Sequence, residues 1–164
     1  MERLGALSRG AGKVYLTGGA TAVLEGWRPT TVDIDLKLDP EPAGAFEAIA
    51  RLKDELDVNV ELAAPDQFIP PLPGWRERSR YIGSWQGVEF FHYDFYAQAL
   101  AKIERGHGRD LRDVHELVRR GMVAPQKLIE HFELIRPELA RYPALDADAF
   151  EAKLREFVDS LRGP

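Results

Sequence analysis

The sequence predicts an α+β protein, with a small mixed β-sheet and flanking helices followed by a C-terminal helical lobe. Strand-like and helix-like segments alternate as β-α-β-α-β over residues 14–62. Two strand-like segments then flank Gln86–Gly87, and every later segment is helix-like. Mixed α/β sequence followed by all-α sequence indicates two lobes. We therefore expect an α/β core over residues 1–94 and a helical lobe over residues 95–164.

Length and composition exclude several classes of protein. The chain has 164 residues, a formal charge of −5 and no cysteine. Its length fits one domain or one domain with a helical appendage, and its acidic balance argues against a general polyanion binder. The missing cysteine excludes disulfides, thiol catalysis and cysteine-containing zinc sites, and agrees with the reducing cytoplasm, where we expect the protein. No apolar run approaches the roughly 20 residues that span a bilayer, so no membrane association is expected.

Periodicity justifies the elements of the first half. Residues 2–8 indicate a short helix, residues 14–17 a buried strand closed by Gly18–Gly19, and residues 20–26 a helix of small residues. Residues 31–38 alternate, which places Asp33, Asp35 and Lys37 on one face of a strand. The opposite face of this strand is expected to carry four apolar residues: Val32, Ile34, Leu36 and Leu38.

The next segments continue this pattern up to a proline-rich stretch. Residues 43–56 have helical periodicity, with Phe46, Ile49, Ala50, Leu52, Lys53 and Leu56 on one broad face. Residues 58–62 alternate as a strand, with Asn59 and Glu61 on its polar side. Four prolines exclude regular structure over residues 65–73.

A basic and aromatic cluster follows the prolines. It comprises Arg76, Arg78 and Arg80 with the aromatic residues Trp75, Tyr81 and Trp85. Such a cluster clamps phosphates or stacks a base, or it is a solvated loop with aromatic residues against a hairpin. The hairpin is expected over residues 81–85 and 88–93.

The predicted lobe consists of helices over residues 95–105, 111–120, 125–140 and 148–161. Asp110 is placed to cap the second of these helices, and Asp148 with Glu151 resembles a capping box for the last. The histidines at 92, 107, 115 and 131 lack close ligand spacing.

The chemistry is expected at Gly18–Gly19 and Asp33-x-Asp35. Two glycines between a strand and a helix let backbone amides approach a ligand such as a triphosphate, although such turns often need glycine for structural reasons. The two aspartates lie on one strand face, about 6 to 7 Å apart along the backbone, and suit Mg²⁺ or Mn²⁺. A third carboxylate would complete a two-metal site, and Glu61 is the best-placed candidate, unless it is simply a solvated strand residue.

These residues, with Arg28 and Thr31, resemble the nucleotidyltransferase superfamily with its polymerase-β-like core. The chain is similar in particular to the small nucleotidyltransferase-like proteins of bacterial toxin–antitoxin and abortive-infection systems. Their signature is a GG or GS turn, an R-x-T-x-D-x-D-like strand and a later K-x-x-x-R…D-x-x-D segment. Here the basic spacing is Lys102-x-x-Arg105, the later acidic pair is Asp110 and Asp113, and the resemblance spans roughly residues 14–122.

The resemblance implies a role for each matching position. The metal would be bound by Asp33 and Asp35, with Glu61 as the third carboxylate. The β- and γ-phosphates would be held by Gly18, Gly19 and the hydroxyl of Thr17 or Thr21, beside Arg28 and Thr31. Lys102, with Arg105 or Arg109, would contact the triphosphate, and Asp110 or Asp113 would orient that lysine or activate an acceptor hydroxyl. The structural alternative is that Lys102 and Arg105 form an ordinary solvated stripe and that Asp113 pairs with arginines.

The implied activity is Mg²⁺- or Mn²⁺-dependent transfer of a nucleotidyl group from an NTP to a hydroxyl of an RNA such as tRNA, or of a protein. A cognate toxin or antitoxin would then be a partner. The first alternative is a catalytically inactive protein of this fold that acts as a regulatory or binding partner. The second is a plain helical interaction module. For an enzyme we expect the site between the two lobes, bordered by residues 65–80.

Overall fold

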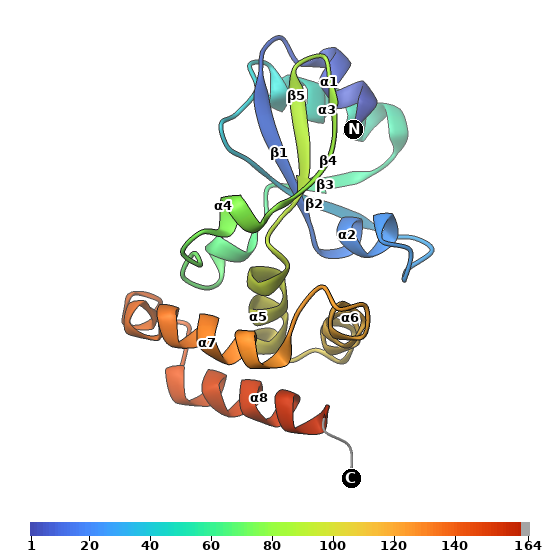
Figure 1. Cartoon of the computed structure of the whole chain (residues 1–164). Helices are drawn as coiled ribbons and strands as arrows, with labels where there is room; N and C mark the ends of the chain where they lie inside the picture. Colours follow the sequence, from blue (N-terminus) through green and yellow to red (C-terminus); the bar gives the residue numbers. More distant parts are fainter. Residues whose placement is uncertain (162–164) are drawn as a thin grey trace. The chain divides into compact units, whose positions relative to one another are not determined.

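The computed structural model describes residues 1–161, shown in Figure 1. Over these residues the chain is α+β, with one five-stranded mixed sheet and eight α-helices, as the sequence predicts. It divides into two compact units, the first of residues 1–64 and 79–93 and the second of residues 65–78 and 94–161. The second unit therefore takes in the proline-rich stretch as well as the C-terminal helices.

The sheet of the first unit has the strand order β3-β2-β1-β5-β4. Its strands are β1 (Gly12–Thr17), β2 (Asp33–Leu38), β3 (Asn59–Glu61), β4 (Arg80–Trp85) and β5 (Val88–His92). Strand β1 pairs antiparallel with β2 and parallel with β5, while β2 pairs parallel with β3 and β4 pairs antiparallel with β5. The predicted hairpin is confirmed, because Gln86 and Gly87 both have positive φ angles, of 54° and 86°, as a two-residue type I′ turn requires.

Three helices belong to this unit: α1 (Glu2–Leu7), α2 (Gly18–Leu24) and α3 (Ala45–Leu56). One apolar cluster joins Leu4 of α1, Ile49 and Leu52 of α3, and strand residues that include Leu16 and Phe90. Full burial of such side chains stabilises a fold by about 1.5–3 kcal/mol each. This cluster fixes one face of β1 and β2, so the alternate residues, including Asp33 and Asp35, lie on the other face.

Two expectations about apolar faces are wrong. Val32 precedes β2 and is 78% exposed, because the strand begins only at Asp33. Phe46 and Leu56 of α3 are each 49% exposed, and Ala50 is also exposed. The buried stripe of α3 is instead Ala45, Ala48, Ile49 and Leu52. The two alanines complete a stripe at helical spacing, so the larger Phe46 turns outward.

The second unit is helical, with α4 (Trp75–Arg78), α5 (Phe95–Arg105), α6 (Gly108–Arg119), α7 (Pro125–Ile135) and α8 (Ala147–Ser160). Helix α5 packs against α6, α7 and α8. The fully buried residues Leu100, Leu117, Leu128, Phe132 and Leu154 form its interior. Two short 3₁₀ helices, η1 (Pro65–Gln67) and η2 (Arg136–Arg141), complete the unit.

The boundaries in this unit differ from prediction in four places. Helix α6 begins at Gly108, so Asp110 lies within it and is not its cap. Helix α8 is capped by Asp146, whose Oδ1 accepts from the backbone N–H groups of residues 148 and 149, and not by Asp148. Helix α7 ends at Ile135, where the chain passes into η2, because Pro137 has no N–H group to continue the α-helical hydrogen bonds. The stretch expected to be irregular, residues 65–73, contains η1, and α4 follows it.

Candidate functional site

The Gly18–Gly19 turn joins β1 to α2, and its neighbours leave no room for larger side chains. Gly18 has a φ of +59°, and a Cβ there would lie 2.7 Å from Oδ2 of Asp35. A Cβ on Gly19 would overlap Oγ1 of Thr31 and lie 3.7 Å from Nη1 of Arg28. A carboxylate, a hydroxyl and a guanidinium therefore surround the turn. All five residues were selected from the sequence, and the structure brings them together.

The second part of the site lies on the edge of the sheet. Parallel pairing sets Asp33 opposite Asn59 and Asp35 opposite Glu61, so the four side chains share one face. The side-chain amide of Asn59 donates to Oδ1 of Asp33 and to Oε1 of Glu61, at 2.8 Å in both cases. The uncharged side-chain amide of Asn59 thus bridges the carboxylates of Asp33 and Glu61.

Asn59 is the site residue that sequence reasoning missed. The alternation of Asn59 with Glu61 in the sequence already indicates that both belong to the polar side of a strand. Its contact with Asp33 depends on the parallel register of β2 and β3. That register joins segments 26 residues apart, which local periodicity does not encode.

The acidic side chains do not converge as a ready three-carboxylate site. Within residues 1–161, no group of three or more His, Asp or Glu side chains is arranged to hold a metal ion. The carboxylate of Asp35 lies against Gly18, while Glu61 is exposed and hydrogen-bonded to Asn59.

The two candidate threonines have different surroundings. Thr17 is 6% exposed and pairs with Asp35 across β1 and β2, which puts both side chains on one face. The hydroxyl oxygen of Thr21 lies 3.3 Å from the carbonyl oxygen of Leu16 and 3.2 Å from Nδ1 of His92. The structure therefore places Thr17 beside Asp35, and Thr21 in a separate buried group.

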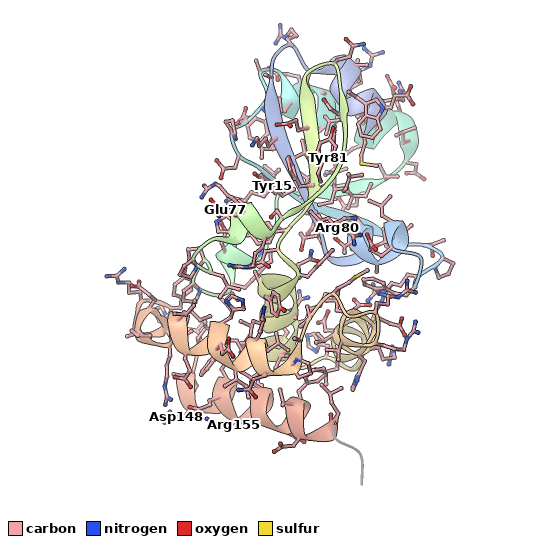
Figure 2. The ribbon with its side chains drawn as sticks, viewed as in Figure 1. Tyr15, Glu77, Arg80, Tyr81, Asp148 and Arg155 are labelled. Carbon is pink, nitrogen blue, oxygen red and sulfur yellow. The ribbon has the colours of Figure 1, made fainter. Side chains whose placement is uncertain are left out.

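This second group, the His92 cluster, consists of the buried Thr21 and His92 with Glu25 and the exposed Arg80. Nε2 of His92 lies 2.9 Å from Oε1 of Glu25, which also pairs with the guanidinium of Arg80, labelled in Figure 2. Burial, with Arg80 close by, lowers the pKa of His92 to about 4. The imidazole is thus neutral at pH 7 and donates from Nε2 to Glu25. The cluster ties the helix after Gly18–Gly19 to β4 and β5.

A second ionic group, the Lys102 cluster, lies in the helical unit and consists of Lys102, Arg105, Asp110 and Asp113. Nζ of Lys102 lies 3.1 Å from Oδ1 of Asp110 and 2.7 Å from Oδ2 of Asp113. Arg105 also reaches Asp110, at 3.0 Å. Lys102 and both aspartates are buried, with 6%, 9% and 2% exposure. The structure thus engages Lys102 with both carboxylates, while Arg109 and part of Arg105 are exposed.

The arginines of the basic and aromatic cluster have partners within the chain. Arg78 donates to the buried carboxylate of Asp94 at 2.6 Å and to the carbonyl oxygen of Pro73 at 2.8 Å. Arg80 pairs with Glu25, and the guanidinium of Arg76 lies 4.5 Å from the ring centre of Trp75. Two of these three cations are therefore balanced by carboxylates of the protein, which leaves less charge for a nucleic acid.

The described residues 1–161 contain no helix that is long and apolar enough to cross a membrane. Comparison with protein-family models, curated proteins and solved structures finds no match to the chain.

Proposed function

We propose that the protein is a nucleotidyltransferase that binds an NTP and Mg²⁺ or Mn²⁺ at Gly18–Gly19 and Asp33-x-Asp35. The observation that carries the proposal is the packing of Asp35 against Gly18, and of Thr31 and Arg28 against Gly19. A glycine turn, a guanidinium and a carboxylate are groups that recognise a metal-bound phosphate. Both glycines are needed for this close approach.

Two carboxylates are enough for the metal in this proposal. Mg²⁺ is commonly held by one or two carboxylates, with phosphate and water oxygens completing its octahedron. Asp33 and Asp35 are the protein ligands, and Glu61 joins them if it exchanges its bond to Asn59 for the ion. When bound, the ion neutralises negative charge on the phosphates and the leaving group.

The reaction is transfer to phosphorus. The acceptor hydroxyl oxygen forms a bond to the α-phosphorus, and the bond from that phosphorus to the α–β bridging oxygen breaks. Pyrophosphate leaves, and the hydroxyl proton passes to a carboxylate or to water. Gly18, Gly19, Arg28, Thr31 and Thr17 hold the phosphates in place, and positioning with charge stabilisation supplies most of the rate.

The cations of the helical unit are secondary candidates for the triphosphate. Arg105 and Arg109 are exposed enough to meet an anion, whereas Lys102 would have to loosen its bonds to Asp110 and Asp113. In the proposal the acceptor is a hydroxyl of an RNA such as tRNA, or of a protein, in the cytoplasm. A toxin or antitoxin partner belongs to the same proposal.

One observation favours a second candidate function, a catalytically inactive nucleotide-binding or regulatory protein. Asn59 occupies the position between Asp33 and Glu61 and bonds both. While the carboxylate of Glu61 stays bonded to Asn59, it does not serve as the third carboxylate of a two-metal site. This alternative keeps nucleotide binding and loses transfer.

Direct binding separates these functions. Mn²⁺ is titrated with and without each NTP by electron paramagnetic resonance, using wild type, D33N/D35N and the control E47Q/D54N. The control removes the same charge from two exposed positions of α3 in the same unit. The proposal predicts at least tenfold weaker Mn²⁺–NTP binding in D33N/D35N alone. Equal binding by all three proteins would contradict it.

A nucleotidyl-transfer assay then distinguishes the enzyme from the catalytically inactive alternative. Protein, Mg²⁺, α-³²P-labelled NTPs and tRNA or cell lysate are incubated together. Label on an acceptor supports the enzyme, provided that D33N/D35N abolishes it. Tight binding without label on any acceptor supports the inactive alternative.

A further inference from the structure

A second candidate site lies on the opposite face of the sheet from Asp33 and Asp35. A cavity of about 280 Å³ lies among α1, α2, α3 and strands β1, β2, β3 and β5. Its lining includes core residues, among them Leu16, Leu36 and Phe90, which are at most 5% exposed. It also includes Met1, Leu24 and Leu56, which are 38%, 45% and 49% exposed and so mark its mouth. The cavity thus runs from the surface into the hydrophobic core.

The lining chemistry selects the kind of occupant. Thr31 is the one polar side chain among the lining residues, and none is charged. Its hydroxyl already donates to the carbonyl oxygen of Asp33 at 2.9 Å. Beyond the partly buried α-amino group of Met1, which belongs to the mouth, a charged ligand or a peptide backbone would lose hydration here without gaining partners, which costs several kcal/mol. An uncharged apolar molecule has no such cost.

The volume limits the size of that molecule. A dry apolar cavity of about 150 Å³ in a protein interior accepts benzene. The cavity found here is nearly twice as large. We propose that it is a binding site for a small, uncharged, apolar molecule of up to ~10 carbon atoms, such as a fused bicyclic aromatic or a branched hydrocarbon.

The cavity is connected to the Gly18–Gly19 turn through two elements. Ala20, Val23 and Leu24 of α2 line it, and α2 begins at Gly18. Thr31 also lines it and packs against Gly19. An occupant should therefore be sensed at the backbone amides of both glycines, independently of any nucleotide chemistry.

Naphthalene is the probe that tests the site. It is titrated into ¹³C-methyl- and ¹⁵N-labelled protein up to its solubility limit, and chemical shifts are followed. We expect saturable shifts in the methyl groups of Leu16, Leu36 and Ile49 and in the amides of Gly18 and Gly19. The charged analogue naphthalene-2-sulfonate should bind at least tenfold more weakly. No saturable shift with naphthalene, or equal binding of the two probes, would overturn the proposal.

Variants distinguish the cavity from surface adsorption. Leu24→Trp fills the mouth and should weaken naphthalene binding at least tenfold, whereas Leu134→Trp, at a 56% exposed position of α7, should not. Ala20→Leu fills the cavity one turn earlier on the same helix, α2, and repeats the test if Leu24→Trp unfolds. Equal loss in Leu134→Trp would show nonspecific binding. Protein self-association that competes with naphthalene and is lost in Leu24→Trp would show that a second copy occupies the cavity, and would also overturn the proposal.

Discussion

The sheet edge and the α5–α6 pair both carry acidic residues selected from the sequence. The carboxylates of the two regions differ in the kind of group that is bonded to them. In the Lys102 cluster, two aspartates share a buried ammonium, and Arg105 adds a second cation. At the sheet edge, the donor between Asp33 and Glu61 is the uncharged amide of Asn59. A cluster that balances its own charge holds a structure together, whereas carboxylates bridged by a neutral amide keep the charge that attracts a cation.

The largest expected effect tests the structural half of this comparison. Lys102→Met leaves Asp110 and Asp113 buried without their shared cation, so the free energy of unfolding should fall by about 3–5 kcal/mol. Urea denaturation measures the change. Lys127→Met, at an exposed position of α7, should change it by less than about 0.5 kcal/mol. Equally small losses of unfolding free energy in Lys102→Met and Lys127→Met would show that the Lys102 cluster does not hold the structure together.

The contribution of the His92 cluster to the stability of the fold should depend on pH. The pKa of His92 is lowered from 6.5 to about 4 in the folded protein, so between these values the unfolded chain binds the extra proton. Stability is therefore lost as pH falls from 6.5 towards 4, by about 3 kcal/mol from this residue. Urea denaturation at several pH values should show this loss in wild type and a shallower one in His92→Gln. The same pH dependence of the unfolding free energy in wild type and His92→Gln would show that His92 does not cause the loss.

A smaller effect is expected at Asn59. Asn59→Ala removes two hydrogen bonds at a partly exposed site, so the free energy of unfolding should fall by about 1 kcal/mol. Ser84→Ala, at an exposed position of β4, serves as the control and should change little. An unfolding free energy that rises in Asn59→Ala would show that Asn59 does not stabilise the pair of carboxylates.

The smallest effect on stability is expected at the aspartates themselves. Asp33→Asn with Asp35→Asn relieves repulsion between like charges on one strand face, so the free energy of unfolding should stay within about 0.5 kcal/mol of wild type or rise slightly. Denaturation of this variant beside Lys102→Met completes the comparison. A loss as large as that of Lys102→Met would assign Asp33 and Asp35 a structural role instead.

Local signals in the sequence predict much of this fold. Alternation over residues 31–38 locates β2, and Gln86–Gly87 locates the hairpin turn. Helix boundaries were less predictable where a side chain had a tertiary use: Asp110 binds Lys102 instead of capping α6. Val32 was misplaced because alternation does not say where a strand begins. Phe46 was misplaced because Ala45 and Ala48, and not the larger apolar residues, complete the buried stripe of α3.

The candidate site shows the same limit. Gly18, Gly19, Thr31 and Asp35 were found from residue type and spacing, because close backbone approach requires glycine. The contacts of Asn59 within the site, and of His92 in its own cluster, were missed because they depend on strand pairings and on packing between distant segments. The pairing of Lys102 with both aspartates likewise depends on how α5 and α6 pack.

Asp33 and Asp35 are proposed to bind a divalent metal together with an NTP, with Asp35 packed against Gly18. The most direct measurement is electron paramagnetic resonance of Mn²⁺ with NTP, comparing wild type, D33N/D35N and E47Q/D54N. We expect wild type and E47Q/D54N to bind the Mn²⁺–NTP complex equally and D33N/D35N to bind it at least tenfold more weakly. Equal affinity in all three proteins, or no binding by wild type, would contradict it.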